Sequence, residues 1–307
     1  MMFGWYHRQH NRANLFLCRF LVGCVMMERN TTDSCLRLQT TEPMATALPS
    51  NGILTFLTDF SSADGYVGAM KGVALSESTE LTLVDIGHEI PAFDIRRAAY
   101  TLRMAVPEFP SGTTHVAVID PGVGTSRKVL VAHVRDQFVV GPDNGLISLL
   151  LDWAPDAQVF AVESKHLPDT IRSATFHGRD IFTPIAAKIA CGRLDVPGDL
   201  KVLPKPIVFD TSFQREKQTI TGTVLCADRF GNLITSIPFE ELQSAGLSTV
   251  HIGQTEITRF VETYGNAEPG AVVALKGSLG LLEISVINGD AAKRLSVTNG
   301  TTVRIRL

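Results

Sequence analysis

The stretch ILTFLT-DFSSADG-YVGAMKGVAL, residues 53–75, decides the fold class of this chain. Residues 53–58 form a short apolar run that predicts a buried strand, 59–65 a polar turn, and a helical pattern follows from 66 to 75. A strand that leads through a turn into a helix is the unit from which layered α/β domains are built. The stretch therefore predicts an α/β domain.

The same alternation continues along the chain. The predicted elements are strands at 81–86, 115–119 and 158–162, a hairpin of 128–134 and 137–140, and helices at 94–106, 146–153 and 180–190. Because the two strands of a hairpin are antiparallel, the central sheet is predicted to be mixed.

The pattern changes in the last third of the chain. Short apolar runs with Gly and Asn turns predict strands at 219–227, 233–237, 248–252, 272–276, 281–286 and 301–307. Strands this short and close are typical of a small barrel or sandwich. We expect an α/β domain over 51–200, a proline-punctuated linker over 201–217, and a smaller all-β, barrel-like domain over 218–307.

The composition favours an enzyme of the cytoplasm. Of the 307 residues, 45% are hydrophobic and 19% are charged, and the formal net charge is -3, values usual for a soluble globular protein. Lys and Arg are scattered, so nucleic acid is not an expected partner. The 5 cysteines are odd in number and lack close spacing, which argues against a disulfide framework or a zinc knuckle.

The first fifty residues differ from the rest. The apolar run 15–27 contains Arg19, and it is too short and too polar to span a membrane. Arg8 and Arg12 imitate the basic region of an export signal, but no clear cleavage site follows. We interpret 1–50 as a disordered or misassigned extension, with Met44 as an alternative start and an export signal as the less favoured reading.

Two loops carry the residues with the most specific chemistry. DPGVGTSR at 120–127 follows a predicted strand, and HGRD at 177–180 precedes a predicted helix. Open α/β sheets hold ligands at strand ends, so Asp120, Arg127 and His177 form a candidate catalytic set. The alternatives are an ion pair that only holds its loop, and a histidine that only packs.

Other polar residues have two readings each. Asp59 ends a predicted strand, where a carboxylate can bind a ribose diol or a metal, or can cap the next helix. Asp64 lies on the same turn and is a weaker candidate. Asp228 and Asn232 lie between two predicted strands, as a hairpin turn or as readers of an adenine edge or an ammonium group. No pair of residues shows the tight spacing of metal ligands, and the serine-hydrolase, P-loop and zincin signatures are absent from the sequence.

The ordered motifs resemble one family. They are TDF at 58–60, YVGAMKG at 66–72, HEIP at 88–91, VIDPGVGT at 118–125, PDNG at 142–145, FHGRDIF at 176–182 and DRFGNL at 228–233. From about residue 53 to 307 the chain resembles the S-adenosyl-L-methionine (SAM) hydroxide adenosyltransferases, the adenosine-forming SAM hydrolases related to fluorinating and chlorinating enzymes. The resemblance implies hydrolysis of SAM to adenosine and methionine, without metal or cofactor.

The resemblance also assigns residues. It implies that water is activated by Asp120, Arg127 and His177. For the substrate it implies ribose contacts from Asp59, walls from Phe93 and Phe176, adenine recognition by Asn232, and methionine contacts from Asp228 and Ser278. Asp64 remains a candidate substrate contact from its place on the turn alone. It implies a homotrimer with each site between two subunits.

Two positions separate the hydrolases from their halogenating relatives. In the halogenases a Tyr takes the place of Asp120, and the halide-binding Ser falls where this chain has Gly178. Asp120 and Gly178 therefore favour hydrolysis, with halide-dependent adenosyl transfer and non-catalytic binding of adenosine or SAM as alternatives. Leu279 stands where the halogenases tend to carry an Arg, so the contact to the methionine carboxylate is left unassigned.

Overall fold

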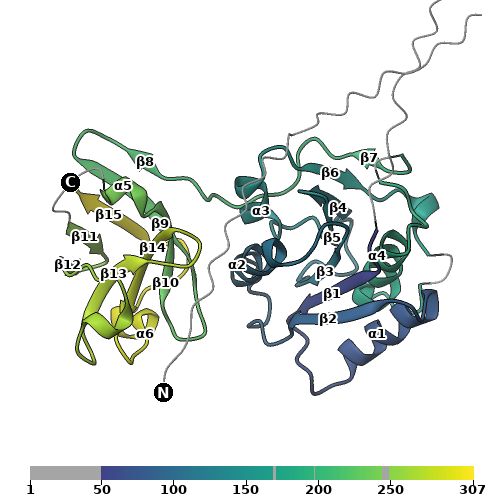
Figure 1. The fold of residues 1–307 in the computed structure, drawn as a ribbon, viewed down its shortest axis with the longest axis horizontal. Helices are drawn as coiled ribbons and strands as arrows, with labels where there is room; N and C mark the ends of the chain where they lie inside the picture. Colours follow the sequence, from purple (N-terminus) through teal and green to yellow (C-terminus); the bar gives the residue numbers. More distant parts are fainter. Residues whose placement is uncertain (1–49, 169–170, 197, 244–248) are drawn as a thin grey trace, which may run out of the picture. The chain divides into compact units, whose positions relative to one another are not determined.

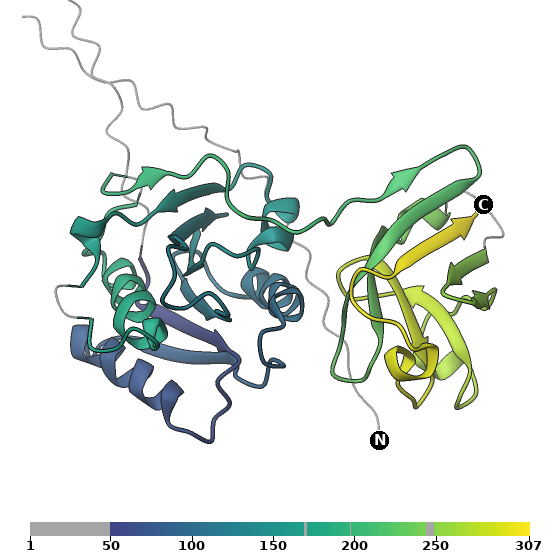
Figure 2. The same ribbon diagram turned by 180° about the vertical axis from the view of Figure 1, so that it is seen from behind.

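The computed structural model describes residues 50–168, 171–196, 198–243 and 249–307. The predicted extension over 1–50 lies outside these ranges except for Ser50. The described residues form a seven-stranded sheet flanked by helices and an eight-stranded antiparallel sheet (Figures 1 and 2). This confirms the predicted fold class, an α/β layer followed by an all-β part.

The first sheet has the strand order β2-β1-β3-β5-β4-β6-β7. Its strands are β1 (Ile53–Thr58), β2 (Thr82–Gly87), β3 (Thr114–Val118), β4 (Val129–Val134), β5 (Gln137–Pro142), β6 (Gln158–Ala161) and β7 (Lys201–Val202). Strand β1 runs parallel to β2 and β3, and β3 runs parallel to β5. Strand β4 is antiparallel to both β5 and β6, so the sheet is mixed as predicted.

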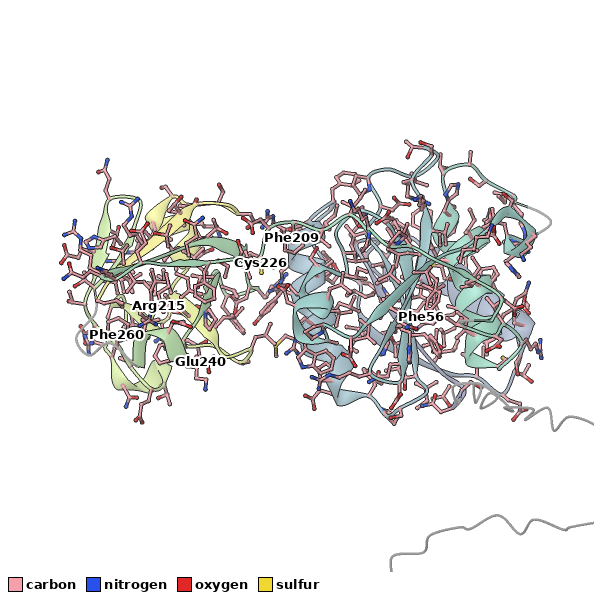
Figure 3. The ribbon with its side chains drawn as sticks, turned by 90° about the horizontal axis from the view of Figure 1, so that it is seen from above. Phe56, Phe209, Arg215, Cys226, Glu240 and Phe260 are labelled. Carbon is pink, nitrogen blue, oxygen red and sulfur yellow. The ribbon has the colours of Figure 1, made fainter. Side chains whose placement is uncertain are left out.

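Helices cover both faces of this sheet. One face packs against α1 (Tyr66–Glu77) and α4 (Thr183–Ala190), and the other against α2 (Ile95–Ala105) and α3 (Ser148–Trp153) (Figure 1). Phe56 of β1 is fully buried in the core on the first of these faces (Figure 3). Among the described residues, no helix has both the length and the apolar composition required to cross a membrane.

The second sheet nearly closes on itself. Its strands are β8 (Gln214–Arg215), β9 (Thr219–Ala227), β10 (Leu233–Pro238), β11 (Thr249–Ile252), β12 (Thr255–Ile257), β13 (Val272–Lys276), β14 (Leu281–Val286) and β15 (Thr302–Arg306), accompanied by α5 (Glu240–Gln243) and α6 (Ala291–Leu295). The path runs from β12 through β9 to β13. The backbones of Arg259 and Val261 bond to Ala274 of β13, which joins the two ends of the path. A barrel-like arrangement follows.

The described residues belong to one compact unit, Thr46–Leu307. Ala99 of α2 and Leu149 of α3 pack against Leu225 of β9. The segment 201–217, which the sequence assigned to a linker, contributes β7 to the first sheet and β8 to the second. Strands of two residues carry no periodic pattern, so sequence reasoning does not find them.

A histidine lies in the core of the first sheet. His115 of β3 is fully buried, and its ring nitrogens contact Thr55 Oγ1 and Gln137 Oε1, each at 2.8 Å. Because Gln137 donates its amide N–H to the Phe109 carbonyl, its oxygen accepts from His115 Nε2, and Nδ1 accepts from Thr55. Burial lowers the pKa of His115 from 6.5 to about 4, so the ring is neutral.

Because of His115, we expect the free energy of unfolding to fall in acid. The unfolded chain binds a proton at His115 near pH 6.5, whereas the folded chain binds it only near pH 4. The contribution of the neutral His115 to the free energy of unfolding is therefore fully present above pH 6.5 and is lost as the pH falls toward 4. At about 1.4 kcal/mol per pKa unit, we expect a loss of about 3 kcal/mol. Urea unfolding of the wild type and of His115→Gln between pH 7 and 4 measures it. Equal pH dependence in both proteins contradicts the prediction.

Candidate active site

The candidate site lies where β1 and β3 end. Asp120 follows β3, and the loop after it turns back through two backbone bonds, from Val123 N–H to the Asp120 carbonyl and from Thr125 N–H to the Gly122 carbonyl. Gly124 adopts a φ of +78°, a conformation that suits glycine. This tight loop returns Arg127 to the side of Asp120.

Arg127 and Asp120 form a buried ion pair. Arg127 Nε lies 2.9 Å from both carboxylate oxygens of Asp120, and Nη2 lies 2.5 Å from Oδ2. The two side chains are only 9% and 4% exposed. The guanidinium carbon also lies 4.9 Å from the centre of the Phe182 ring. A fork of this kind fixes the orientation of the carboxylate.

His177 completes the predicted set. Its Nδ1 lies 2.7 Å from Arg127 Nη2. Since a guanidinium only donates, Nδ1 is the acceptor, and the proton of the neutral ring is on Nε2. Burial, and secondly the charge of Arg127, lower the pKa of His177. The structure therefore joins Asp120, Arg127 and His177 through one guanidinium, with a neutral imidazole at one end.

A π-helical turn, Gly178–Phe182, follows His177 and runs directly into α4. The Thr183 N–H bonds to the Gly178 carbonyl, five residues back, and the Thr183 hydroxyl bonds to the same oxygen at 2.8 Å. Asp180 accepts a bond from Arg179 Nε at 2.6 Å and from the Ser173 N–H at 2.8 Å. Turns of this type occur often at functional sites. Here it begins directly after His177.

Gly178 lies against a cluster of aromatic rings. The rings of Phe60, Tyr66 and Phe176 have centroids 5.1 to 5.9 Å apart. A Cβ added at Gly178 would lie 3.1 Å from the Phe60 ring and 3.3 Å from the sulfur of Met70. A side chain at this position would therefore displace its neighbours.

Asp59 is held by the backbone of an exposed aromatic residue. Its Oδ2 accepts a bond from the Phe93 N–H at 2.9 Å, and Phe93 has a φ of +66° and is 68% exposed. Strained backbone of this kind clusters at ligand sites. The helix-cap reading of Asp59 is wrong for α1, whose N-cap is Gly65. Asp64 lies exposed in the turn before α1.

Three further predicted residues line a pocket of about 660 Å³: Asp228, Asn232 and Ser278. Asp228 Oδ1 accepts from the N–H groups of Phe230 and Asn232, both at 2.8 Å, and Oδ2 accepts from the Asn232 amide at 2.9 Å. The hairpin-turn reading of this segment is therefore true of its geometry. The turn also leaves the Asn232 amide oxygen available to a ligand.

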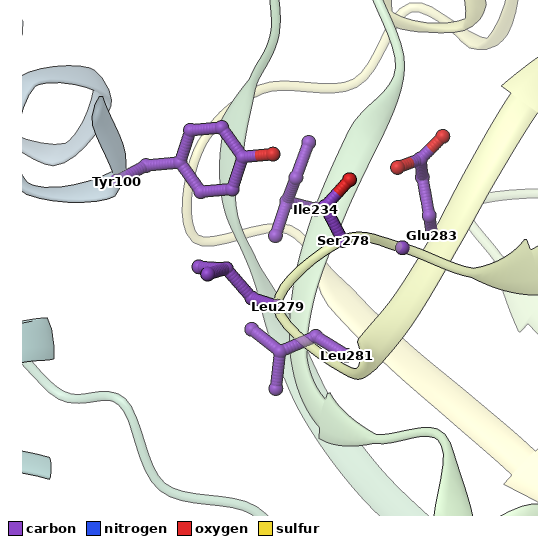
Figure 4. A pocket seen from close by; sticks show the side chains of 7 residues that line it. Tyr100, Ile234, Ser278, Leu279, Leu281 and Glu283 are labelled. Carbon is purple, nitrogen blue, oxygen red and sulfur yellow. The ribbon is translucent and has the colours of Figure 1, made fainter. Parts of the chain in front are cut away.

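The same pocket contains residues that the sequence analysis missed. Tyr100, Tyr264 and Glu283 line it as well. Figure 4 shows a smaller pocket that shares Tyr100, Ser278 and Glu283 with it and that includes Leu279. A signal for Glu283 was present, because it is an acidic residue inside the apolar strand LLEISV at 281–286.

Comparisons with known proteins identify the family of this chain. The SAM hydroxide adenosyltransferase N-terminal domain matches residues 54–197, and the C-terminal domain of the same family matches residues 222–304. The chain is 37% identical over 271 residues to a protein of Salinispora arenicola named (R)-S-adenosyl-L-methionine hydrolase, which covers 82% of this chain and 97% of that protein. It is 38% identical over 261 residues to a protein of the same name from Thermus thermophilus, with 81% and 98% covered.

More distant and structural relatives complete the comparison. A fluorinase of Actinopolyspora mzabensis is 23% identical over 291 residues, with 83% of this chain and 97% of that enzyme covered. A solved structure of an uncharacterized conserved protein from Thermotoga maritima superposes with a TM-score of 0.73 at 33% identity, covering 83% of this chain and 100% of that one.

Proposed function

Since this chain belongs to the SAM hydroxide adenosyltransferase family, we propose that it hydrolyses SAM to adenosine and L-methionine. The proposed substrate is the epimer that has the (R) configuration at the sulfonium sulfur. The names of the relatives at 37% and 38% identity support the reaction and the epimer. The observation that carries the proposal is the set of Asp120, Arg127 and His177, joined by hydrogen bonds around a buried ion pair.

The reaction makes one main demand on the protein. Attack at the ribose C5′ breaks the bond to a sulfonium and releases a neutral thioether, so the leaving group needs no acid. The barrier lies in presenting one oriented water molecule in line with the bond that breaks. The three polar side chains serve this purpose.

The hydrogen bonds suggest how the proton moves. His177 Nδ1 already accepts from Arg127, so the neutral ring offers water a donor, its Nε2–H. Asp120 has lone pairs beyond those that Arg127 uses, and it is the remaining acceptor of the set. In this proposal His177 positions the water, Asp120 accepts its proton, and Arg127 fixes both and stabilises the negative charge that develops.

The substrate contacts follow the assignments of the resemblance. Asp59 holds the ribose hydroxyls with Asp64 nearby, Phe93 and Phe176 form walls, Asn232 reads adenine, and Asp228 with Ser278 holds the methionine portion. The rings of Phe93 and Phe230 are exposed, as expected if a neighbouring subunit completes each site. We therefore propose a homotrimer, and we propose that the enzyme is cytoplasmic.

Incubation with each SAM epimer, followed by chromatography, tests the function. We expect protein-dependent release of equal amounts of adenosine and methionine from the (R)-epimer, and much slower release from the (S)-epimer. Binding of SAM in calorimetry without any product would instead favour a non-catalytic binding protein. Release of adenosine from the (S)-epimer alone would contradict the assigned epimer.

Gly178 offers a test against the halogenase alternative. We expect Gly178→Ser to give no 5′-halo-adenosine in chloride or fluoride, and to lower kcat about 10-fold or more, because its Cβ would press on Phe60 and Met70 and misplace His177. Gly178→Ala adds the same Cβ without a hydroxyl and is the matched control. A halogenated product from the Ser variant would show that this position alone decides between the two reactions.

A further inference from the structure

Glu283 is a buried carboxylate that the assignments above do not use. It lies in β14 and is only 4% exposed, yet it lines the 660 Å³ pocket that contains Asp228, Asn232 and Ser278. Burial of a carboxylate is costly unless donors or a positive charge compensate it. The groups around Glu283 therefore indicate what it is for.

One oxygen of Glu283 is held by two hydroxyl groups. Oε1 accepts from the Tyr264 hydroxyl at 2.5 Å and from the Ser285 hydroxyl at 2.9 Å. Burial and the hydrogen bond to Glu283 raise the pKa of Tyr264, so its hydroxyl remains a donor. These two bonds fix the orientation of the carboxylate.

The other oxygen has a different environment. Oε2 makes no hydrogen bond within the described residues, and a Cβ at Gly277 would lie 2.9 Å from it. Glycine at 277 therefore avoids a clash that a side chain at this position would make with the oxygen.

No cation among the described residues forms an ion pair with Glu283. Among the same residues, the pocket lining contains Asp228 and Asp290 but no Lys, Arg or His. Both oxygens of Asp228 already accept hydrogen bonds within its own turn, and Asp290 pairs with Lys293 at 2.9 Å. Only Glu283 presents an oriented carboxylate with an unused oxygen and no countercharge.

We propose that Glu283 binds the α-ammonium group of the methionine portion of the substrate and is a specificity-determining residue. This inference rests on the proposed function. An ammonium group has three N–H donors and can bond to Oε2, whereas a sulfonium has none. Ser278 lines the same pocket and offers a second acceptor. Glu283 thus selects a ligand that carries a free amino acid and not a bare nucleoside.

The test uses a ligand without a sulfonium. S-adenosyl-L-homocysteine keeps the ammonium group but has a neutral thioether, and its analogue with hydrogen in place of the amino group lacks the ammonium as well. In calorimetry, Glu283→Gln should weaken binding of S-adenosyl-L-homocysteine about 10- to 100-fold, the usual range for a hydrogen bond to a charged group. Binding of the analogue and of adenosine should change less than about 3-fold.

Two more variants complete the design. Glu283→Asp keeps the charge but withdraws it by one methylene, so it should weaken the same ligand selectively even if the Gln variant folds poorly. Glu256→Gln removes an exposed charge on β12 and should change nothing.

The remaining outcomes overturn the inference. Equal weakening of both thioether ligands means a structural role, weakening of adenosine means that Glu283 reads adenine, and weakening of SAM alone means that it pairs with the sulfonium. Unchanged binding of every ligand means no contact. Failure of the proposed function has a separate signature, because the wild type would then release no adenosine from either SAM epimer.

Discussion

Replacement of Arg127 by methionine is expected to lower kcat at least about 10³-fold with a much smaller change in KM. The guanidinium bonds to both oxygens of Asp120 and to His177 Nδ1, so its loss disorients both groups that would act on the water. It also leaves the Asp120 carboxylate, only 4% exposed, without a countercharge. We therefore expect the free energy of unfolding to fall by about 3 kcal/mol.

Two further variants show which property of Arg127 matters. Arg127→Lys keeps the charge but cannot bond to Asp120 and His177 at once through a planar guanidinium. Compared with Arg127→Met, it should restore the free energy of unfolding more than kcat. Arg103→Met removes an arginine that stacks on Trp153, outside the candidate site, and should leave kcat unchanged. Steady-state kinetics and urea unfolding give both quantities. An Arg127→Met enzyme within tenfold of the wild-type kcat would refute the role of the fork.

The second large loss of kcat is expected from substitution of His177. We expect His177→Ala to lower kcat about 10²- to 10³-fold, but His177→Gln to remain within about tenfold of the wild type. The amide of Gln can accept from Arg127 and still donate to water, as the neutral imidazole does. If His177 were instead the base, Gln would be as inactive as Ala.

The pH profile separates the same two roles. Burial and Arg127 lower the pKa of His177 below 6.5. When the ring is protonated, Nδ1 becomes a donor that faces the Arg127 donor, so their hydrogen bond breaks. We expect the wild-type rate to be constant above pH 6.5 and to fall with acid through this lowered pKa, and we expect that limb to disappear in His177→Gln. An unchanged limb in the variant would assign the titration to another group.

The fold was predictable where the periodic pattern is long. The run 53–58 was predicted as a strand and is β1, and the two runs separated by Arg135 and Asp136 form the β4–β5 hairpin. Some short elements were missed, among them β12 and α6, because such segments are too short to show a clear period. The position of β12 depends on its pairing with β11, and that of α6 on a cap from Asp290.

The candidate site was predictable in its residue types and not in its geometry. Asp120 and Arg127 lie seven residues apart on one loop, so their pairing could be anticipated. His177 lies 50 residues beyond Arg127, and no spacing reveals which ring nitrogen meets the guanidinium. Glu283 is visible in the sequence as an acidic residue inside an apolar strand, but its contacts with Tyr264 and Ser285 are formed only in the tertiary structure.

The π-helical turn after His177 has a consequence for how this chemistry can change in evolution. A π turn contains one residue more than the α-helical path it replaces, and one residue of an α-helix corresponds to a rotation of about 100°. We expect deletion of a single residue within 178–182 to let α4 continue as an uninterrupted helix and to rotate the imidazole away from the guanidinium. A change of one codon could then rearrange the candidate site through the rotation of a helix end.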